Sequence, residues 1–335
     1  MISTTERSES GVALVLVLLT FSIIGVLAGE FARAMREDAT STRNFKQETV
    51  AHYVALAGIN EAILAIQSTR ALSGRRPDLR TAEQPVRGPI RTLLDADGAW
   101  VKATFNGHQY QIRATDEAGL ISLNEADDRA LREIMLNLGY TDLEADEVAD
   151  SILDWRDPDD LHRINGAESD YYEGMPRPYR AKNADFDALE ELLLVRGVTR
   201  EMFFGGAGHK GLREVFSVFN STKGVNLRSV SAPTLLALSG LGSEQVDDIV
   251  GRRTELGHDI SEEIRMAIEA SGVEARTGTP LVMTLEARVL SESRSGEADP
   301  HTLAHIGIVV RMPPRGDGFR TYRWYDAIYE PDTKN

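Results

Sequence analysis

The first fifth of the chain carries two hydrophobic patterns in succession. Residues 11–29 include no ionisable side chain, and a helix of that length spans roughly the 30 Å hydrocarbon core of a bilayer. Residues 30–67 are polar and lack proline, but apolar residues such as Ile59 and Ile63 recur there at steps of three and four. The two patterns predict one continuous helix of about 55 residues, of which about a third can cross a membrane.

Alternating apolar and polar positions predict β-strands at both ends of the remaining chain. Two alternating runs flank Asn106–Gly107, a pair that readily adopts positive φ and favours a tight hairpin. Three more runs occupy residues 281–293, 303–312 and 319–329. Between the two β regions, the pattern of residues 119–277 is helical throughout. The predicted fold is therefore α+β, with a long N-terminal helix packed on a small antiparallel sheet whose chain is interrupted by a large all-α insert.

The insert contains an internal repeat. Residues 119–156 and 224–253 share the order turn, strand-like pair, helix, glycine hairpin, helix, and the unit resembles the helix-hairpin-helix, or SAM-like, module. In the versions of this module that bind nucleic acid, N–H groups at the hairpin glycines hold a phosphate. Acidic residues such as Glu244 and Asp247 follow the hairpins here and would repel a phosphate. We therefore expect these modules to pack against partner proteins.

Acidic residues crowd into residues 154–172, where Pro158 and Asn165–Gly166 force the chain to turn. Carboxylates this close repel one another unless a cation or arginines intervene. Calcium, which takes about six to eight oxygen ligands in flexible geometry, suits an irregular loop better than magnesium. A solvated acidic loop paired with Arg156 and Arg163 is the alternative. The candidate metal ligands are Asp154, Asp157, Asp159, Asp160, Glu168 and Asp170.

These six acids are not equal candidates. Asp157, Asp159 and Asp160 are the strongest, because they stand together in the turn after the predicted helix. Asp154 has another use open to it, since a carboxylate at the end of a helix beside Trp155 can cap or pair locally.

Charge and composition narrow the function classes. The formal net charge of −15 disfavours unassisted binding to nucleic acid, because that affinity comes largely from cations that displace counterions. The chain has no cysteine, so it has neither a disulfide framework nor a thiolate metal site or nucleophile. No nucleophile motif or serine-histidine-acid set stands in a recognisable context. We therefore predict that the protein is not an enzyme.

The opening helix, apolar first and amphipathic second and entered through a glycine, resembles the type IV pilin and pseudopilin family. In that family a prepilin peptidase cuts after the glycine, which implies cleavage after Gly11 and a mature chain that begins at Val12. Most pseudopilins carry a glutamate where this chain has Leu16. The missing glutamate, the large insert and the acidic stretch followed by a tyrosine pair resemble the protein K minor pseudopilins of type II secretion. The N-terminal residues alone also leave an ordinary signal anchor open.

The resemblance implies a role, a location and partners. A protein K subunit caps the tip of the secretion pseudopilus, helps to initiate filament assembly and supports the export of folded proteins from the periplasm. By resemblance, the partners are the minor pseudopilins I and J and the prepilin peptidase, the helix crosses the inner membrane once, the head lies in the periplasm, and the insert holds calcium. No nucleic-acid partner is expected. The alternative is a membrane-anchored helix-hairpin-helix protein that binds nucleic acid.

The patterns and the resemblance together divide the chain into five expected segments. They are a prepilin leader (1–11), the helix with the first strands (12–118), a first SAM-like module with the acidic loop (119–223), a second module (224–277) and the strands that complete the sheet (278–335).

Overall fold

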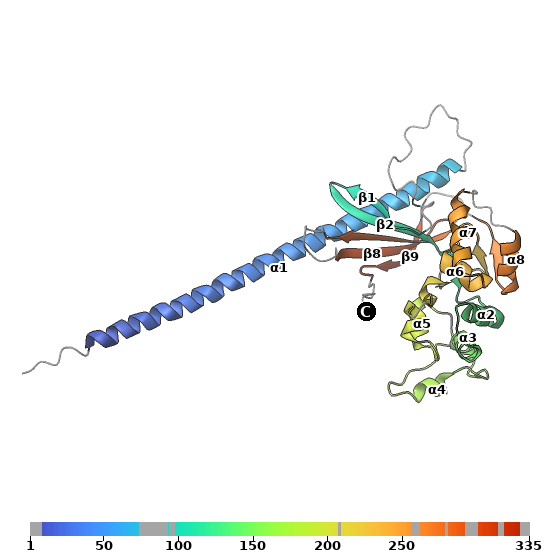
Figure 1. The fold of residues 1–335 in the computed structure, drawn as a ribbon, viewed down its shortest axis with the longest axis horizontal. Coiled ribbons are helices and arrows are strands. Elements are labelled where there is room, and N and C mark those ends of the chain that lie inside the picture. Colours follow the sequence, from blue (N-terminus) through green and yellow to red (C-terminus); the bar gives the residue numbers. More distant parts are fainter. Residues whose placement is uncertain are drawn as a thin grey trace, which may run out of the picture.

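The structure is a computed structural model that describes residues 9–73, 93, 98–206, 209–255, 262–278, 281–291, 301–313 and 318–328. Most of the expected leader, residues 1–8, therefore lies outside the described residues. Helix α1 (Glu9–Ser73) is one helix of 65 residues, which confirms the predicted continuous helix and makes it longer, at about 100 Å. Its N-terminal half, which begins with the apolar run, extends away from the rest of the chain (Figure 1). It is the one described helix that is long and apolar enough to cross a membrane.

The C-terminal part of α1 packs on the sheet. Its buried positions, among them Ala55, Ile59 and Ala62, follow the helical spacing seen in the sequence and face one side of the strands. Gly58 allows the close approach, because a Cβ at this position would stand 2.4 Å from the ring of Tyr110. The Tyr110 hydroxyl donates a hydrogen bond of 2.6 Å to Glu61 of the same helix. The second half of α1 is therefore part of the folded head, whereas the first half is not.

The sheet is antiparallel and draws its strands from both sides of the insert. Its order is β1-β2-β7-β8-β9, and each of these strands overlaps one of the alternating runs seen in the sequence. Asn106 (φ 48°) and Gly107 (φ 82°) both have positive φ, which confirms the tight hairpin between the first two strands. The strands are β1 (Val101–Phe105), β2 (His108–Asp116), β7 (Val282–Leu290), β8 (Thr302–Arg311) and β9 (Arg320–Tyr325).

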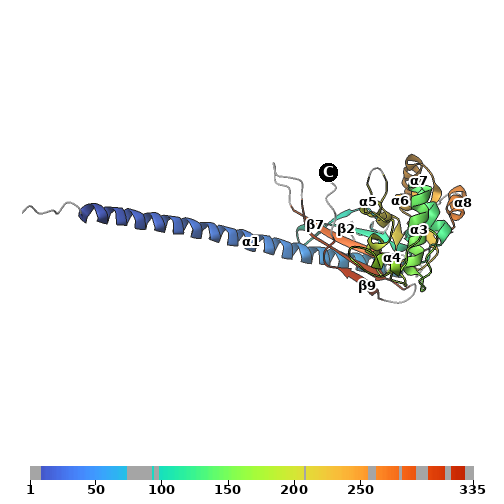
Figure 2. The same ribbon diagram turned by 90° about the horizontal axis from the view of Figure 1, so that it is seen from below.

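The insert leaves the sheet after β2 and returns to it at β7, and it lies at the end of the head that is remote from the N-terminal half of α1 (Figures 1 and 2). Its helices are α2 (Asp128–Asn137), α3 (Asp142–Arg156), α4 (Ser169–Glu173), α5 (Arg200–Phe204), α6 (Ala232–Ser239), α7 (Ser243–Glu255) and α8 (Glu262–Ala270). Three 3-10 turns, η2 (Glu117–Gly119), η3 (Leu189–Leu194) and η4 (Leu212–Glu214), and four short strands complete it.

The prediction that residues 119–277 are helical throughout is wrong in one respect. Strand β3 (Ile121–Ser122) pairs in parallel with β4 (Phe216–Ser217), and β5 (Gly224–Asn226) pairs in parallel with β6 (Glu274–Arg276). Strands β3 and β5 coincide with the strand-like pairs of the internal repeat, whereas β4 and β6 had no signal, because two or three residues are too few to show an alternating pattern. The β3–β4 pair encloses helices α2 to α5, and the β5–β6 pair encloses helices α6 to α8.

The two cores of the head do not coincide with the expected modules. One cluster joins α1 to the sheet, and the other runs through the insert from Ile121 to Val273, across both SAM-like segments. The element order of the first segment, β3-α2-Gly139-α3, matches that of the second, β5-α6-Gly240-α7. The likeness to SAM-like modules and the segment boundaries stay predictions.

Two consecutive acids tie the insert to the sheet. The carboxylate of Glu117 accepts hydrogen bonds from Thr284 on β7 and Ser217 on β4. Asp116 accepts from Asn226 (2.9 Å) and Ser229 (2.5 Å) in the second module. Both acids are buried, and burial raises their pKa values despite these hydrogen bonds. Asp116 and Glu117, here called the joint, thus connect the sheet to the insert through buried hydrogen bonds.

Candidate metal site

The acidic stretch begins at the end of helix α3. Local sequence signals fix both ends of this helix. Thr141 and Glu144 form a capping box at its N-terminus, and the helix ends at Arg156, just before Asp157 and Pro158. Near its end, Trp155 lies in an aromatic cluster with Tyr172, at a ring-centroid distance of 5.3 Å. This packing fixes the point at which the acidic loop leaves the helix.

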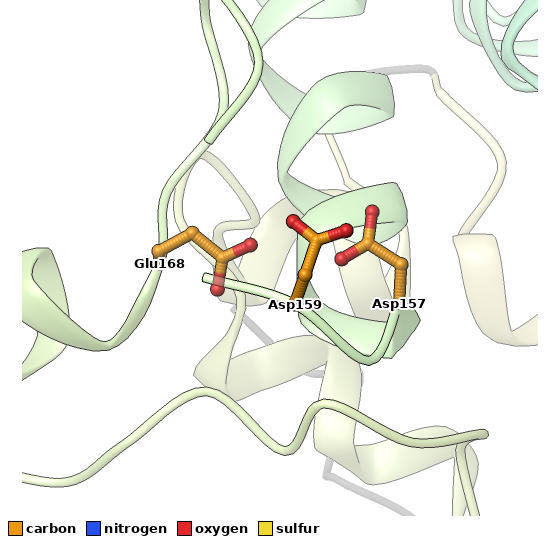
Figure 3. Close-up of side chains that lie close together, drawn as sticks. All are labelled: Asp157, Asp159 and Glu168. Carbon is orange, nitrogen blue, oxygen red and sulfur yellow. The ribbon is translucent and has the colours of Figure 1, made fainter. Parts of the chain in front are cut away.

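Three of the six predicted acids come together after that point. One carboxylate oxygen from each of Asp157, Asp159 and Glu168 lies within 4.8 Å of the others, and Figure 3 shows Glu168 reaching across to the two aspartates. Glu168 is 1% exposed. Neither of its carboxylate oxygens, nor Oδ1 of Asp157, has a hydrogen-bond partner among the described residues. In these three residues, the carboxylate trio, a buried glutamate with unused acceptors therefore faces a half-buried and an exposed aspartate.

The electrostatics of the trio are unfavourable without a cation. Burial, together with the nearby carboxylates of Asp154 and Asp157, raises the pKa of Glu168 to about 7. A buried, unpaired carboxylate either takes up a proton or finds a positive partner. The structure thus brings three of the predicted acids together and adds unpaired buried acceptors that the sequence could not reveal. Cation binding at this cluster stays a prediction.

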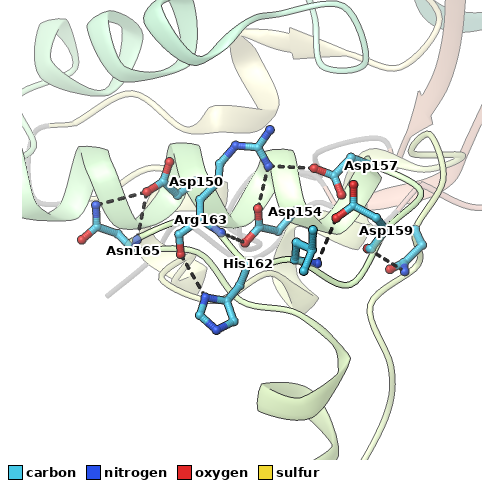
Figure 4. A network of polar contacts seen from close by, with 9 residues as sticks. Asp150, Asp154, Asp157, Asp159, His162, Arg163 and Asn165 are labelled. Carbon is cyan, nitrogen blue, oxygen red and sulfur yellow. Dashed lines mark hydrogen bonds and ion pairs between the residues drawn. The ribbon is translucent and has the colours of Figure 1, made fainter.

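Asp154 has a different role, one that the sequence left open. Its Oδ1 lies 2.6 Å from the guanidinium of Arg163 and its Oδ2 accepts the Arg163 backbone N–H at 3.0 Å (Figure 4). The same guanidinium lies 2.7 Å from Asp157. Burial raises the pKa of Asp154 more than Arg163 lowers it. Asp154 therefore anchors the returning loop locally instead of joining the trio.

The remaining two predicted ligands lie outside the trio. Asp160 accepts a hydrogen bond of 3.0 Å from the side chain of Asn183, and Asp170 accepts one of 2.8 Å from the backbone N–H of Tyr171. Of the two arginines predicted to neutralise the stretch in the alternative interpretation, only Arg163 does so. Arg156 turns away and donates to the backbone carbonyls of Leu123 and Ala126.

Sequence reasoning missed two residues that shape the site. Asp150 accepts hydrogen bonds from the backbone N–H and the side-chain amide of Asn165, at 3.0 and 3.1 Å. It precedes Asp154 by one helical turn, a spacing that signals a shared face of α3. Asn183 donates to the carbonyl of Asp159 at 3.0 Å, and its own Oδ1 is buried without a hydrogen-bond partner among the described residues. No local sequence pattern connects Asn183 to the loop, because they lie 24 residues apart.

Comparison with known proteins finds similarity to one family. The model of the family described as type II secretion system (T2SS), protein K, matches residues 104–204, which contain the whole acidic stretch. The chain is 24% identical over 263 residues to type II secretion system protein K of Pectobacterium carotovorum subsp. carotovorum, across 74% of this chain and 76% of that one. The chain is therefore similar to the type II secretion system protein K family, through the family model over residues 104–204 and through a relative aligned over about three quarters of its length.

Other members of the protein K family match over a shorter length. The protein K of Aeromonas hydrophila is 26% identical over 206 residues, and the putative protein K of Escherichia coli K12 is 24% identical over 203 residues. Each alignment spans 59% of this chain and 61% of the relative. The chain thus spans about three fifths of the length of these two relatives and about three quarters of the first.

The protein K fold is confirmed by a solved structure. A chain of the crystal structure of the GspK-GspI-GspJ complex from the enterotoxigenic Escherichia coli type 2 secretion system has a TM-score of 0.55. The match covers 87% of this chain and 99% of that one, at 13% sequence identity. This confirms the predicted α+β architecture of a long N-terminal helix, an antiparallel sheet and helices.

Proposed function

We propose that the protein caps the tip of the type II secretion pseudopilus as a minor pseudopilin, where it helps to initiate filament assembly and the export of folded proteins. The shape of α1 is the observation that carries this proposal. Its first third carries the apolar run, which is exposed over residues 13–29, whereas the insert lies at the opposite end of the molecule (Figure 2). An apolar helix of this kind is stable only in lipid or among other apolar helices. A bulky insert fits the end of a filament better than its tightly packed shaft.

Leu16 supports the position at the tip. A carboxylate inside a membrane costs several kcal/mol unless it has a partner, about 3 kcal/mol on insertion scales. In related subunits the partner is the terminal amine of a neighbouring subunit. Leu16 lies exposed on the apolar run of α1 and cannot make that pair. A subunit with no neighbour above it has no need of the carboxylate.

The proposed partners are minor pseudopilins of the I and J type. The similar solved chain belongs to a complex of three such proteins, and the exposed apolar run of α1 offers a surface for partner helices. We place α1 across the inner membrane in a single pass, with the head in the periplasm, because the secretion system that names the family moves proteins outward from there. A prepilin peptidase would cut between Gly11 and Val12, and both residues lie within α1.

Processing and assembly are tested separately. Intact mass and N-terminal sequencing of the membrane-extracted protein, expressed with its own prepilin peptidase, should give a chain that begins at Val12. A chain that still begins at Met1 would make Gly11 part of a plain anchor. For assembly, the tagged protein should co-purify with the I-type and J-type pseudopilins, and pseudopilus formation should fail without the gene. Normal filaments in its absence would contradict the capping role.

We further propose that the carboxylate trio binds calcium. Asp157, Asp159 and Glu168 would hold the ion, with Asn183 Oδ1 as a neighbouring acceptor still unused among the described residues. Hard oxygen donors from an irregular loop suit calcium. The ion would supply positive charge to a buried acidic cluster and so stabilise the loop, without any catalytic step. A melting-temperature titration with calcium tests this proposal.

A further inference from the structure

The loop that follows α3 presents two aliphatic side chains to solvent. Leu161 is 79% exposed and Ile164 is 98% exposed. They are three residues apart on a stretch that is described throughout, between Pro158 and Glu168. Single exposed aliphatic residues are common on protein surfaces. Two largely exposed aliphatic side chains on one short loop need a specific explanation. The backbone of the loop provides it.

The backbone on both sides of Ile164 is held to α3. The N–H of Arg163 donates to Asp154 and the N–H of Asn165 donates to Asp150, each at 3.0 Å (Figure 4). Asp150 and Asp154 are one turn apart on the same face of the helix. The N–H of Leu161 is held as well, by Asp159 at 2.9 Å. These bonds fix the backbone, so the loop cannot turn its aliphatic side chains inward without breaking them.

We propose that Leu161 and Ile164, the loop knob, dock into an apolar recess with a cationic rim on a partner protein of another kind. Rigid presentation lowers the entropy lost on binding, which is what a docking surface requires. Charge selects the kind of partner. Asp160, directly before Leu161, is exposed and lies outside the carboxylate trio. Arg163, between the two knob residues, already pairs with Asp154 and Asp157, so the surrounding stretch stays acidic.

Other occupants fit this charge less well. A second copy of the chain would bring the same acidic loop and a net charge of −15, so like charges would meet at the contact. An anionic lipid surface attracts basic segments rather than acidic ones. A protein recess that is apolar at its centre and lined with lysine or arginine at its edge satisfies both the aliphatic side chains and the carboxylates beside them. The docking of the loop knob rests on the proposed function only in one respect, namely that the partner meets the head in the periplasm.

Site-specific photocrosslinking tests the loop knob in the full chain. The photoreactive residue p-benzoylphenylalanine replaces Ile164 in cells that carry the intact secretion system, and the crosslinked peptide is identified by mass spectrometry. Leu143, which is 72% exposed on the first turn of α3, is the matched control position. We expect position 164 to crosslink to one partner protein, at a peptide with apolar residues and lysine or arginine, with at least a fivefold lower yield of that product from position 143.

The purified pair then provides a quantitative test. Ile164→Asp should weaken the binding of the full chain to the crosslinked partner at least tenfold, whereas Leu143→Asp should change it less than twofold. Raising the salt concentration should weaken binding of the parent protein. Crosslinks to lipid or to a second copy, equal yields at both positions, no crosslink at position 164, or an unchanged affinity of Ile164→Asp would each overturn the proposal.

The loop knob and the proposed function can fail independently. Co-purification with the I-type and J-type pseudopilins depends on α1 and should be unchanged in Ile164→Asp. If the parent protein itself does not co-purify with them, the capping role fails. If the parent co-purifies, and position 164 gives no crosslink or Ile164→Asp leaves the affinity unchanged, only the loop knob fails.

Discussion

Gly166 lies so close to Asp154 that a Cβ on the glycine would stand 2.0 Å from Oδ2 of the aspartate. Two residues that are separated by the whole acidic turn therefore meet at the end of α3. The carboxylate at this contact also holds the backbone and the guanidinium of Arg163. The return of the loop to α3, and with it the position of Glu168 opposite Asp157 and Asp159, depends on this contact.

Gly166→Ala should therefore destabilise the protein by about 2 kcal/mol or more, because the added methyl group forces the buried Asp154 carboxylate away from Arg163. Gly174→Ala is the control, since the nearest atom to a Cβ there is 3.4 Å away. Thermal or chemical denaturation measures the difference. Equal stabilities of the two variants would show that the loop can relax around the methyl group.

Calcium should raise the melting temperature of the parent protein, since a ligand that binds only the folded state stabilises it by about 2.7 kcal/mol at a hundred times its Kd. Asp157→Asn and Asp159→Asn should remove most of this response, because each takes a carboxylate from the trio. Asp170→Asn serves as the control, as that side chain bonds to the backbone N–H of Tyr171. A parent protein that does not respond to calcium would refute the site.

The effect of Glu168→Gln on stability should change sign when calcium is added. The pKa of Glu168 rises from 4.5 to about 7 on folding, so its contribution to stability is full below pH 4.5 and is lost as the pH rises through 7. Without calcium at pH 8, Glu168→Gln should therefore be more stable than the parent, by at most about 3 kcal/mol. With calcium, the parent should be the more stable of the two. The measurement is a set of melting curves at pH 5 and pH 8, with calcium and with a chelator.

Glu117→Gln should stabilise the joint between the sheet and the insert at high pH. Burial raises the pKa of Glu117, and the neighbouring carboxylates of Asp116 and Glu286 raise it further. Stability that depends on protonated Glu117 is therefore present at low pH and is lost as the pH rises through the raised pKa. Glutamine stays neutral and can still bond to Ser217 and Thr284.

The melting temperature of Glu117→Gln should thus exceed that of the parent by a few degrees at pH 8, at about 2–4 °C per kcal/mol for a domain of this size, and approach it at pH 5. Glu125→Gln, at an exposed position, should differ little from the parent at either pH. A Glu117→Gln protein that is less stable than the parent at pH 8 would mean that the ionised carboxylate is the form that the joint requires.

The sequence by itself determined the long helix, the hairpin and the other strands, because each has a periodic pattern or a turn signal in its own residues. The apolar run of residues 11–29 and the spacing of Ile59 and Ile63 define α1, and Asn106–Gly107 defines the turn. It also showed that the acids of residues 154–172 need positive charge, since close carboxylates repel at any arrangement.

Only the tertiary structure decided which acids meet. Glu168 and Asp157 come together because the chain turns back on α3, while Asp154 is occupied by Arg163 and Asp160 by Asn183. The short parallel pairs of the insert and the joint at Asp116 and Glu117 likewise depend on partners at least 50 residues away in the chain. Contacts of this kind have no local signal, because the energy that selects them comes from packing and burial in the finished fold.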